Sequence, residues 1–368
     1  MIYLNAASHG LPDVAVRDRM RAYLDREDEI GPAAAEIEAG AEMKEVCRKA
    51  ALVIGAAASN VTLVGTTTIG WNSAVTSLPL AGRRVLIAPG AWASDAAVLA
   101  RMGARVEVMP EDGQGCLDLA ALQTRIDDDV AAICAPMICS LTGEHYPLEA
   151  IGALARPDTT LFIVDAAQAV GQVPVSVDVL GCDVLAATTR KWLRGPRDTA
   201  LLYVSDKAFA QMRANPAPRL FGIAFQDGRF EDEAGIRRFD PNSAFAPQRL
   251  GLGVALDQFL ADPEAFMRRP AQLARKVREH AEACGIATAC PCAGVPSAIT
   301  TLRLREPVFD AIADRLKASN IGVATPSPSC EPLRPPETVD GRFLRLSPHA
   351  YNSEDEIAQV FEIIRTAA

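Results

Sequence analysis

The sequence predicts an α/β protein in which a large domain, built on a mainly parallel seven-stranded sheet, is joined to a smaller α+β domain. The chain has 368 residues, which exceeds the size that one hydrophobic core normally serves. Seven short β-rich runs alternate with helical stretches up to residue 204, and such alternation builds parallel sheets that helices cover on both faces. Beyond residue 206 the alternation weakens into a polar, loop-rich stretch, so we expect a second domain to follow.

The predicted elements follow from the periodicity of the apolar residues and from the Gly and Pro residues that bound them. The seven strands are expected at 60–64, 84–88, 105–109, 130–135, 160–164, 184–187 and 200–204. Connecting helices of crossover length are expected at 92–102, 117–127 and 147–155. For the second domain the pattern predicts helices at 250–260, 270–284, 308–319 and 354–366 and a strand at 298–304. We assign the large domain to 20–245 and the small domain to 1–19 plus 246–368.

Composition and charge exclude several classes of protein. Apolar residues make up 49% and charged residues 23% of the chain, the balance of a globular enzyme and not of a disordered protein. The formal charge of -9, without any Lys/Arg-rich run, argues against a nucleic-acid partner. The sequence shows neither a basic-then-apolar leader nor a run of about 18 apolar residues, so we expect a cytoplasmic protein without a membrane segment.

The cysteines do not indicate a disulfide framework or a metal site. Their number, nine, is odd and they are scattered along a long chain, so reduced thiols are expected. The one close pair, Cys290 and Cys292, has no nearby Cys or His to complete a tetrahedral zinc site. We therefore expect no metal.

Two polar side chains follow consecutive predicted strands, where open α/β sheets bind their ligands. Asp165 follows the run at 160–164, and a carboxylate there can keep a pyridine nitrogen protonated, although Asp is equally typical of a helix N-cap. Lys191 follows the next strand. A lysine amine condenses with an aldehyde only when it is unprotonated, and burial beside cations such as Arg190 and Arg194 lowers its pKa toward that state.

The motifs around these residues carry a family resemblance. Asp-Ala-Ala-Gln at 165–168 and Thr-Thr-Arg-Lys at 188–191, with Gly-Pro four residues further on, resemble the class V aminotransferase family. That family includes cysteine desulfurases, selenocysteine lyases, carbon-sulfur lyases and isopenicillin N epimerase-like proteins, and the resemblance extends over nearly the whole chain. It implies fold type I of the pyridoxal-phosphate (PLP) transferases and PLP as cofactor. The family usually has His-Lys in the second motif, and Arg-Lys is associated with the epimerase-like branch.

The resemblance also implies roles for individual residues around the cofactor. Lys191 would hold PLP as a Schiff base, Asp165 would contact the pyridine nitrogen, and Gln168 would donate a hydrogen bond to the phenolic oxygen. Ala167 would pack against one face of the ring, and Trp92 would lie over it. The positions that match the phosphate-binding residues of the family are Thr67, Thr68, Ile69, Thr188, Arg190 and, reaching across a homodimer interface, Ser243.

Ordinary structural roles would explain some of these residues equally well. The Thr-rich turn at 65–72 is typical of a capped helix without a ligand. Trp92 is equally compatible with a place in the core. The segment 240–243 contains Asp-Pro and Asn-Ser, which form turns in any context.

The substrate end of the site is predicted near the C-terminus. The segment 344–352 matches the family's Arg-x-Ser-x-x-x-Tyr-Asn, which implies that Arg345 binds the α-carboxylate of an amino acid; a guanidinium fork suits that planar group. Asn5 and Ala7 resemble the N-terminal segment that folds over the site. Ser140 stands where cysteine desulfurases have an Asn that contacts the cofactor.

Cys330 falls in the loop where many desulfurases hold their persulfide cysteine, but only 15 residues separate it from Arg345. That spacing is shorter than the resemblance leads us to expect. Thiol reactivity requires an accessible, electropositive setting. Cys330 is therefore either a nucleophile or a loop cysteine without a catalytic role.

Three functional interpretations follow. The preferred one is a carbon-sulfur lyase or desulfurase-like enzyme that acts on a small α-amino acid by β-elimination. The second is an aminotransferase or epimerase that uses the same Lys191, because PLP weakens whichever bond at the α-carbon stands perpendicular to its ring and the shared residues do not choose that bond. The third is a non-catalytic binding protein of the same fold, against which the presence of Lys191, Asp165 and Arg345 argues.

Overall fold

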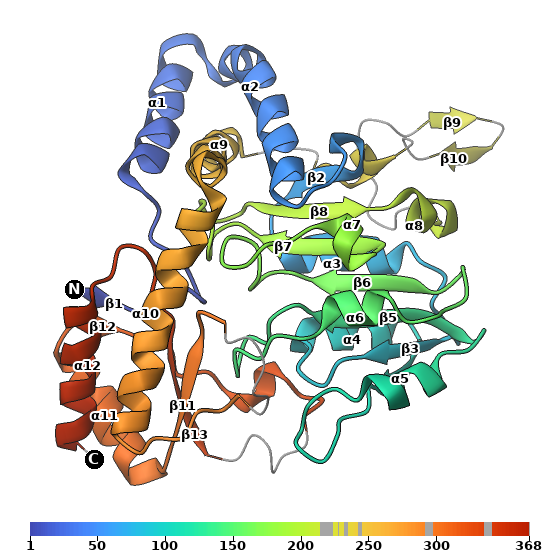
Figure 1. Cartoon of the computed structure of the whole chain (residues 1–368). Coiled ribbons are helices and arrows are strands. Elements are labelled where there is room, and N and C mark those ends of the chain that lie inside the picture. The colour runs from blue at the N-terminus through green and yellow to red at the C-terminus, as the bar shows by residue number, and fades with distance from the viewer. Residues whose placement is uncertain are drawn as a thin grey trace.

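The computed structural model describes residues 1–213, 224–226, 228–231, 235–241, 245–290, 297–334 and 341–367. Figure 1 shows a large α/β part that contains the main sheet and a second part built from α10, α11, α12 and a small sheet. The predicted α/β fold with a mostly parallel seven-stranded sheet is confirmed. Ser243 lies outside the described residues.

The main sheet has the strand order β2-β8-β7-β6-β5-β3-β4. Strand β8 runs antiparallel to both of its neighbours, and the remaining pairs are parallel. Every residue of β5 and β7 is buried, which is why these runs are apolar throughout and do not alternate. The strands are β2 Val61–Val64, β3 Arg84–Ile87, β4 Arg105–Val108, β5 Val130–Pro136, β6 Leu161–Asp165, β7 Val184–Thr188 and β8 Ala200–Val204.

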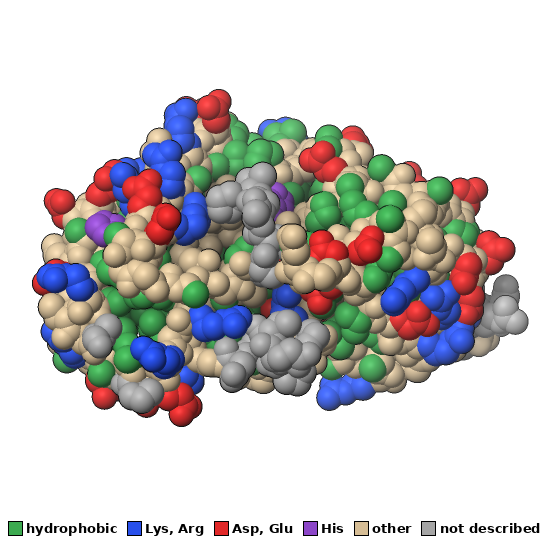
Figure 2. All heavy atoms as spheres, turned by 60° about the horizontal axis from the view of Figure 1, so that its bottom comes forward, with side chains coloured by type: hydrophobic (Ala, Val, Ile, Leu, Met, Phe, Trp, Pro, Cys, Tyr) green, Lys and Arg blue, Asp and Glu red, His purple; other side chains and the backbone are tan. Residues whose placement is uncertain are grey.

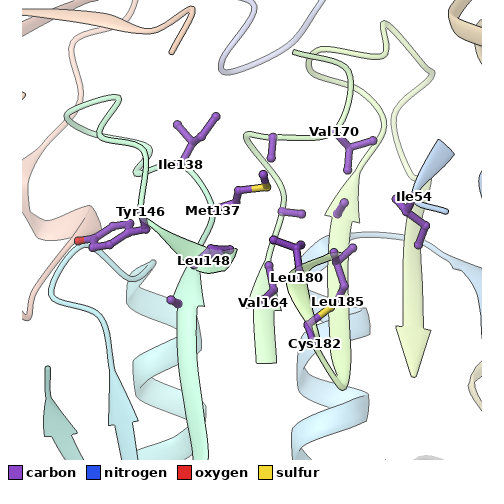
Figure 3. Close-up of a cluster of buried hydrophobic side chains, with 14 of the residues drawn as sticks. Ile54, Met137, Ile138, Tyr146, Leu148, Val164, Val170, Leu180, Cys182 and Leu185 are labelled. Atoms are coloured by element: carbon purple, nitrogen blue, oxygen red, sulfur yellow. The ribbon is translucent and has the colours of Figure 1, made fainter. Parts of the chain in front are cut away.

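Two hydrophobic cores lie on opposite faces of this sheet. In β6, Phe162 and Val164 belong to one core and Leu161 and Ile163 to the other, as the alternation of side chains along a strand requires. Figure 3 shows part of the first core, where Val164 lies among side chains from neighbouring strands and loops. The helices of this part are α3 Thr67–Thr76, α4 Ala93–Arg101, α5 Leu119–Arg125, α6 Leu148–Gly152, α7 Val177–Leu180 and α8 Asp206–Gln211.

Two long helices near the N-terminus were not predicted. Helix α1 (Val14–Ile30) and helix α2 (Pro32–Val53) pack against α9 (Ala246–Ala261), at the top of Figure 1. The Asp13 side chain caps α1 by accepting a hydrogen bond from a backbone N–H of its first turn. The turn between the two helices is made by Gly31, whose φ of 86° favours glycine.

The second part contains α10 (Pro263–Ala283), α11 (Glu306–Ala318) and α12 (Glu354–Ala367), which enclose a third core. It contains two two-stranded sheets, one that pairs β11 with β13 antiparallel and one that pairs β1 with β12 in parallel, so residues 2–3 pair with this part of the molecule. The strands are β1 Ile2–Tyr3, β11 Thr300–Leu304, β12 Ile321–Gly322 and β13 Arg342–Leu346.

Helix α10 begins earlier than the predicted start at residue 270. The Asp262 side chain accepts a hydrogen bond from Ala265 N, and Pro263 occupies the first turn, where its missing N–H is not needed. Pro270 therefore lies inside the helix, seven residues after its start. The prediction was wrong because it treated Pro270 as the helix boundary.

The remaining elements are short. Strands β9 and β10 form an antiparallel pair, and three single turns of 3₁₀ helix complete the described elements. Their bounds are β9 Ala224–Gln226, β10 Arg229–Glu231, η1 Ala58–Asn60, η2 Ile236–Phe239 and η3 Pro328–Cys330.

The structure bears on three expectations for the whole chain, which concern reduced thiols, membrane segments and basic surface patches. Cys116 is disulfide-bonded, so the expectation that all thiols are reduced was wrong. None of the helices within the described residues combines the length and apolar character that a bilayer-spanning segment requires. On the face shown in Figure 2, acidic and basic side chains are interspersed, without a broad basic patch.

Candidate active site

A cavity of about 420 Å³ opens at the carboxyl ends of β5, β6 and β7, and residues of both parts of the molecule line it. Its volume lies in the range of small-molecule sites. Asn5 and Ile69 do not line it. The predicted residues that do are Ala7, Thr67, Thr68, Trp92, Ser140, Asp165, Ala167, Gln168, Thr188, Arg190, Lys191, Cys330 and Arg345.

Asp165 is the last residue of β6, and its carboxyl group faces this cavity. Its Oδ1 accepts a hydrogen bond from Ala167 N at 2.8 Å. No α-helix begins there, since the next one starts at Val177, so the helix-cap interpretation fails. Burial raises the pKa of Asp165, while that hydrogen bond and the charge of Lys191 lower it. This carboxyl is therefore held at a strand end beside an amine.

Lys191 lies just beyond β7, in the same cavity. Burial lowers the pKa of its amine to about 7, and the charges of Arg190 and Arg345 act in the same direction. The carboxylate of Asp165 opposes them. A large fraction of the amine is therefore neutral near pH 7, which is the form that attacks an aldehyde.

Arg194 does not take the place predicted for it beside Lys191. Its backbone adopts a φ of 57°, and its side chain donates to Leu11 O at 2.8 Å and pairs with Asp13 at 3.4 Å. The second cation near the amine is Arg345, which comes from β13. The prediction failed because proximity in sequence does not show which way a left-handed turn directs a side chain.

The N-terminus of α3 lies at the floor of the cavity, which Thr66, Thr67 and Thr68 line. Thr66 caps the helix by accepting a hydrogen bond from Ile69 N at 3.1 Å. Thr67 Oγ1 is buried and has no hydrogen-bond partner among the described residues. A phosphate at this helix terminus would satisfy that hydroxyl. Ile69 N could contact the phosphate only if it gave up its hydrogen bond to Thr66. The side chain of Ile69 is 53% exposed.

Gln168 joins several parts of the cavity wall. Its Nε2 donates to Ala7 O and to Ser140 Oγ, each at 3.0 Å, and its Oε1 accepts from Trp192 Nε1 at 3.0 Å. The amide is thereby oriented with its NH₂ group toward the cavity wall that contains Ser140. A hydrogen bond to the phenolic oxygen of a cofactor would replace one of these two donated bonds.

Trp92 and Asp95 extend the floor from α4. Trp92 is the N-cap residue of this helix, lines the cavity and is 38% exposed, so the core interpretation fails. Asp95 lines the same cavity and is only 4% exposed. Burial, and then the charge of Asp165, raise the pKa of Asp95. Sequence reasoning missed Asp95 because acidic residues are ordinary in the first turn of a helix.

Arg345 provides the opposite wall and is 5% exposed. Nη1 donates to Ser140 O at 2.8 Å and to its Oγ at 3.2 Å, while Nη2 donates to Ser8 Oγ at 2.7 Å. Nε has no partner, and no Asp or Glu among the described residues forms an ion pair with this guanidinium. Burial lowers the pKa of Arg345 to about 10. A buried cation without a counter-ion is suited to an anionic ligand.

The N-terminal segment covers the cavity through contacts with the strand of Arg345. Ala7 N donates to Ser347 Oγ at 3.0 Å, and Asn5 forms a β-bridge with Ser347. Asn5 Oδ1 is buried without a partner among the described residues. Ser8 and His9 also line the cavity, and burial together with nearby cations lowers the pKa of His9 to about 4. No sequence pattern distinguishes these two residues, so they were not predicted.

Cys330 lies in the same wall as Arg345 and is partly buried. Burial, and then the charge of Glu331, raise the pKa of its thiol, and the charge of Arg345 lowers it. The balance favours the protonated thiol, which is a poor nucleophile.

Taken together, the residues of the floor suit PLP. They supply an amine of lowered pKa for its aldehyde and a strand-end carboxyl for its pyridine nitrogen. The unpartnered hydroxyl of Thr67 at a helix N-terminus suits its phosphate. Within the described residues, no group of three His, Cys, Asp or Glu side chains could hold a metal ion.

Comparison with known proteins agrees with this geometry. The family model described as Aminotransferase class-V matches residues 2–360. A probable hercynylcysteine sulfoxide lyase of Mycobacterium tuberculosis is 31% identical over 301 residues, which are 79% of this chain and 71% of that protein. A cysteine desulfurase of Yersinia pestis is 30% identical over 164 residues, covering 42% of this chain and 38% of that protein.

Solved structures share the fold over almost the whole chain. A cysteine desulfurase of Thermococcus onnurineus NA1 gives a TM-score of 0.86 at 19% identity, covering 99% of this chain and 94% of that one. The cystine C-S lyase C-DES, in complex with its reaction product cysteine persulfide, gives 0.85 at 18% identity, covering 99% and 97%. At these identities the likeness concerns the fold alone.

Proposed function

Because this chain belongs to the class-V aminotransferase family of PLP-dependent enzymes, we propose that it is a carbon-sulfur lyase that acts on a small α-amino acid by β-elimination. The observation that carries the proposal is Arg345, a buried cation without an acidic partner among the described residues, in the same cavity as Lys191. A carboxylate site beside a lysine suited to PLP is what an α-amino acid substrate requires.

The floor residues would hold the cofactor and manage one proton. Bound PLP withdraws electrons from the substrate's α-carbon. Lys191 would hold the cofactor through Nζ, and its neutral amine, when free, would accept the proton from the substrate's α-carbon. Asp165 holds a proton on the pyridine nitrogen, and Thr67, Thr68, Thr188 and Arg190 hold the phosphate.

The residues opposite the floor, which are those of the N-terminal segment together with Arg345 and Cys330 and which we call the roof, would orient the substrate. Arg345 binds the α-carboxylate through its guanidinium fork, and the hydroxyl groups of Ser8 and Ser140, which already accept from that fork, restrict its position. Ala7 closes the cavity over this group. Fixing the carboxylate fixes which bond of the α-carbon stands perpendicular to the cofactor ring.

Two considerations favour cleavage of a carbon-sulfur bond. A relative that matches 79% of this chain is named a probable hercynylcysteine sulfoxide lyase, and this name is one ground for proposing the same class of chemistry here. The raised pKa of Cys330 favours a thiol that does not attack sulfur, which suits elimination without a persulfide. In β-elimination the α-proton goes to Lys191, the bond from the β-carbon to sulfur breaks, and its electron pair leaves with sulfur. Hydrolysis of the three-carbon fragment that is left of the amino acid gives pyruvate and ammonia.

A product assay with purified PLP-loaded protein tests this function. We expect S-methylcysteine sulfoxide, S-methylcysteine or cystine to give pyruvate and a sulfur product in equal amounts, and alanine to give neither. A keto acid without sulfur release, together with conversion of the cofactor to its amine form, would identify an aminotransferase. Loss of stereochemistry at the α-carbon without other products would identify an epimerase. A cofactor held by a lysine gives a visible absorption band, and borohydride removes that band. If the PLP-loaded protein has no such band, all three activities are contradicted.

We also propose that the protein acts in the cytoplasm as a homodimer in which Ser243 reaches the phosphate of the neighbouring subunit. Large apolar side chains are exposed on α1, on α2 and at the residue before α9, at one end of the molecule, and they support such an interface. Sedimentation of the purified protein should give twice the mass of one chain; a monomer that retains full activity would contradict the shared site. The side chains are Val14, Leu24, Ile37, Leu52 and, just before α9, Phe245.

A further inference from the structure

A buried cluster of charged and polar side chains lies behind the wall that contains Ser140 and Cys330. The family resemblance assigns no role to it. It brings together the loop after β4, the loop after β5 and the loop before β13, and it contacts the turn that precedes α4. We call it the Glu331 cluster; its members are Glu111, Cys139, Glu144, Tyr146, Glu331 and Arg334.

One carboxylate connects the two residues that face the substrate. Glu331 is 1% exposed, and its Oε1 accepts from Leu141 N at 2.7 Å and from Cys139 Sγ at 2.9 Å. Cys139 and Leu141 are the two neighbours of Ser140, and Glu331 is the neighbour of Cys330. A single side chain therefore links the segment that carries Ser140 to the segment that carries Cys330.

Arg334 extends this connection. Its side chain is 4% exposed, its Nε donates to Glu331 Oε2 at 2.9 Å, and it also pairs with Glu144. Nη2 contacts Tyr146 Oη at 3.2 Å, and that oxygen accepts from Gly90 N at 2.9 Å. Figure 3 shows the Tyr146 hydroxyl directed away from the other labelled apolar side chains. Gly90 itself lines the cavity, two residues before Trp92.

The cluster packs so closely against Gly90 that this position has no room for a side chain. A Cβ atom at this position would lie 2.7 Å from Arg334 Nη2 and 2.7 Å from Tyr146 Oη. The cluster therefore touches the backbone of the cavity wall directly.

Stability alone does not account for such a cluster. Burying ionic groups carries a desolvation penalty, and apolar residues of similar volume often stabilise a protein as well or better. Arg334 faces three carboxylates, those of Glu111, Glu144 and Glu331. What a connected polar network provides is one defined arrangement of the segments that it joins.

We propose that Glu331 and Arg334 are positioning residues that set the spacing of Ser140, Cys330 and Trp92 around the substrate, and thereby determine which amino-acid side chain the enzyme accepts. The proposal rests on the proposed function, since it assumes that this cavity binds an amino acid. It assigns the substrate's α-carboxylate to Arg345 and the selectivity for its side chain to the Glu331 cluster.

Binding to PLP-loaded variants gives the first test. In E331Q, which is nearly isosteric, and in R334K we expect an unchanged cofactor band, because the floor residues are intact. We expect S-methylcysteine to bind about tenfold more weakly, as loss of one buried charged hydrogen bond allows, and alanine to change less than threefold. R84K is the matched control, since Arg84 also bridges two carboxylates, Glu107 and Asp127, but lies at the amino end of β3.

Alkylation of Cys330 gives a second readout that needs neither cofactor nor activity. Iodoacetamide modification, followed peptide by peptide with mass spectrometry, should be several-fold faster at Cys330 in E331Q than in the parent protein and unchanged in R84K. The proposal requires both results. It is overturned if S-methylcysteine and alanine weaken equally in E331Q, or if the alkylation rate of Cys330 changes less than twofold. If R334K does not fold, the binding and alkylation results for E331Q alone test the proposal. The alkylation result stands even if the parent protein shows no lyase activity.

Discussion

The floor and the roof of the cavity are built in different ways. The floor consists of Thr67, Asp165 and Lys191 with their neighbours, which lie at the ends of strands in one sheet or at the helix that follows one. The roof consists of the segment 5–9 together with Arg345 and Cys330, which come from opposite ends of the chain. Hydrogen bonds between these segments hold the roof together, whereas strand pairing fixes the floor.

This difference suggests a separation of tasks. Because the floor residues come from the main sheet and the elements next to it, we expect them to bind a cofactor even when a residue of the roof is replaced. Residues of the roof can bind a substrate only when the segments that carry them, which are 5–9 and those of Arg345 and Cys330, are correctly placed relative to one another. Substitutions in the floor should therefore alter the cofactor, and substitutions in the roof should alter substrate binding while the cofactor stays in place.

The largest effect is expected from K191A. Without the amine, the PLP-loaded protein should lose both the visible band that borohydride removes and its product formation, because no other lysine lines the cavity within the described residues. Absorbance spectra before and after borohydride measure this. K49A is the control, since Lys49 pairs with Asp257 at 2.7 Å outside the cavity. A band that survives in K191A would place the cofactor on another lysine.

D165N should be the next most severe change. The amide retains the size of the side chain but cannot keep a pyridine nitrogen protonated, so we expect turnover to fall ~100-fold or more while the protein still binds PLP. Amino-acid affinity, measured by spectral titration, should change little. Normal turnover in D165N would remove Asp165 from the chemistry of the floor.

R345Q should show the opposite pattern. Removing a charged fork that donates two hydrogen bonds to a carboxylate should weaken amino-acid binding by ~50-fold, with the cofactor band unchanged. Spectral titration with alanine measures the dissociation constant, and R345K should recover part of the loss. A variant that fails to bind PLP would show that floor and roof are not independent.

The smallest expected effect concerns pH. Because the pKa of Lys191 is lowered from 10.5 to about 7, the neutral fraction of its amine rises about tenfold between pH 6 and pH 8. The rate at which cofactor-free protein takes up PLP should rise by the same factor. Lowering the pKa of a buried amine also destabilises the folded cofactor-free protein, fully below about pH 7 and no longer above about pH 10.5. A flat pH-rate profile would contradict the lowered pKa.

The floor was more predictable from the sequence than the roof, for physical reasons. Fully buried strands are continuous apolar runs, so the ends of β6 and β7 can be located from local pattern, and the pair of motifs that follows them singles out Asp165 and Lys191. Arg345 was found only through a motif match. Ser8 and His9 carry no local signal, because their place in the cavity depends on pairing of the N-terminal segment with Ser347.

Among the helices, α1 and α2 were missed because charged residues dominate α1 and small alanines dominate the buried face of α2. Their apolar periodicity is therefore weak, and packing against α9 defines them instead. The prediction for Arg194 failed for a different reason. Its direction depends on a left-handed backbone turn, which is rare outside glycine and asparagine and cannot be anticipated from neighbouring residues.

The hydrogen bond between Ala7 N and Ser347 Oγ joins residues that are 340 positions apart. During synthesis on the ribosome, the strands of the floor emerge and can pair long before Ser347 has been made. Until Ser347 has been made, the segment 5–9 lacks the residue with which it pairs. We therefore expect the cofactor pocket to exist in the nascent chain before the substrate pocket does, so that PLP can enter from the side that the roof later closes.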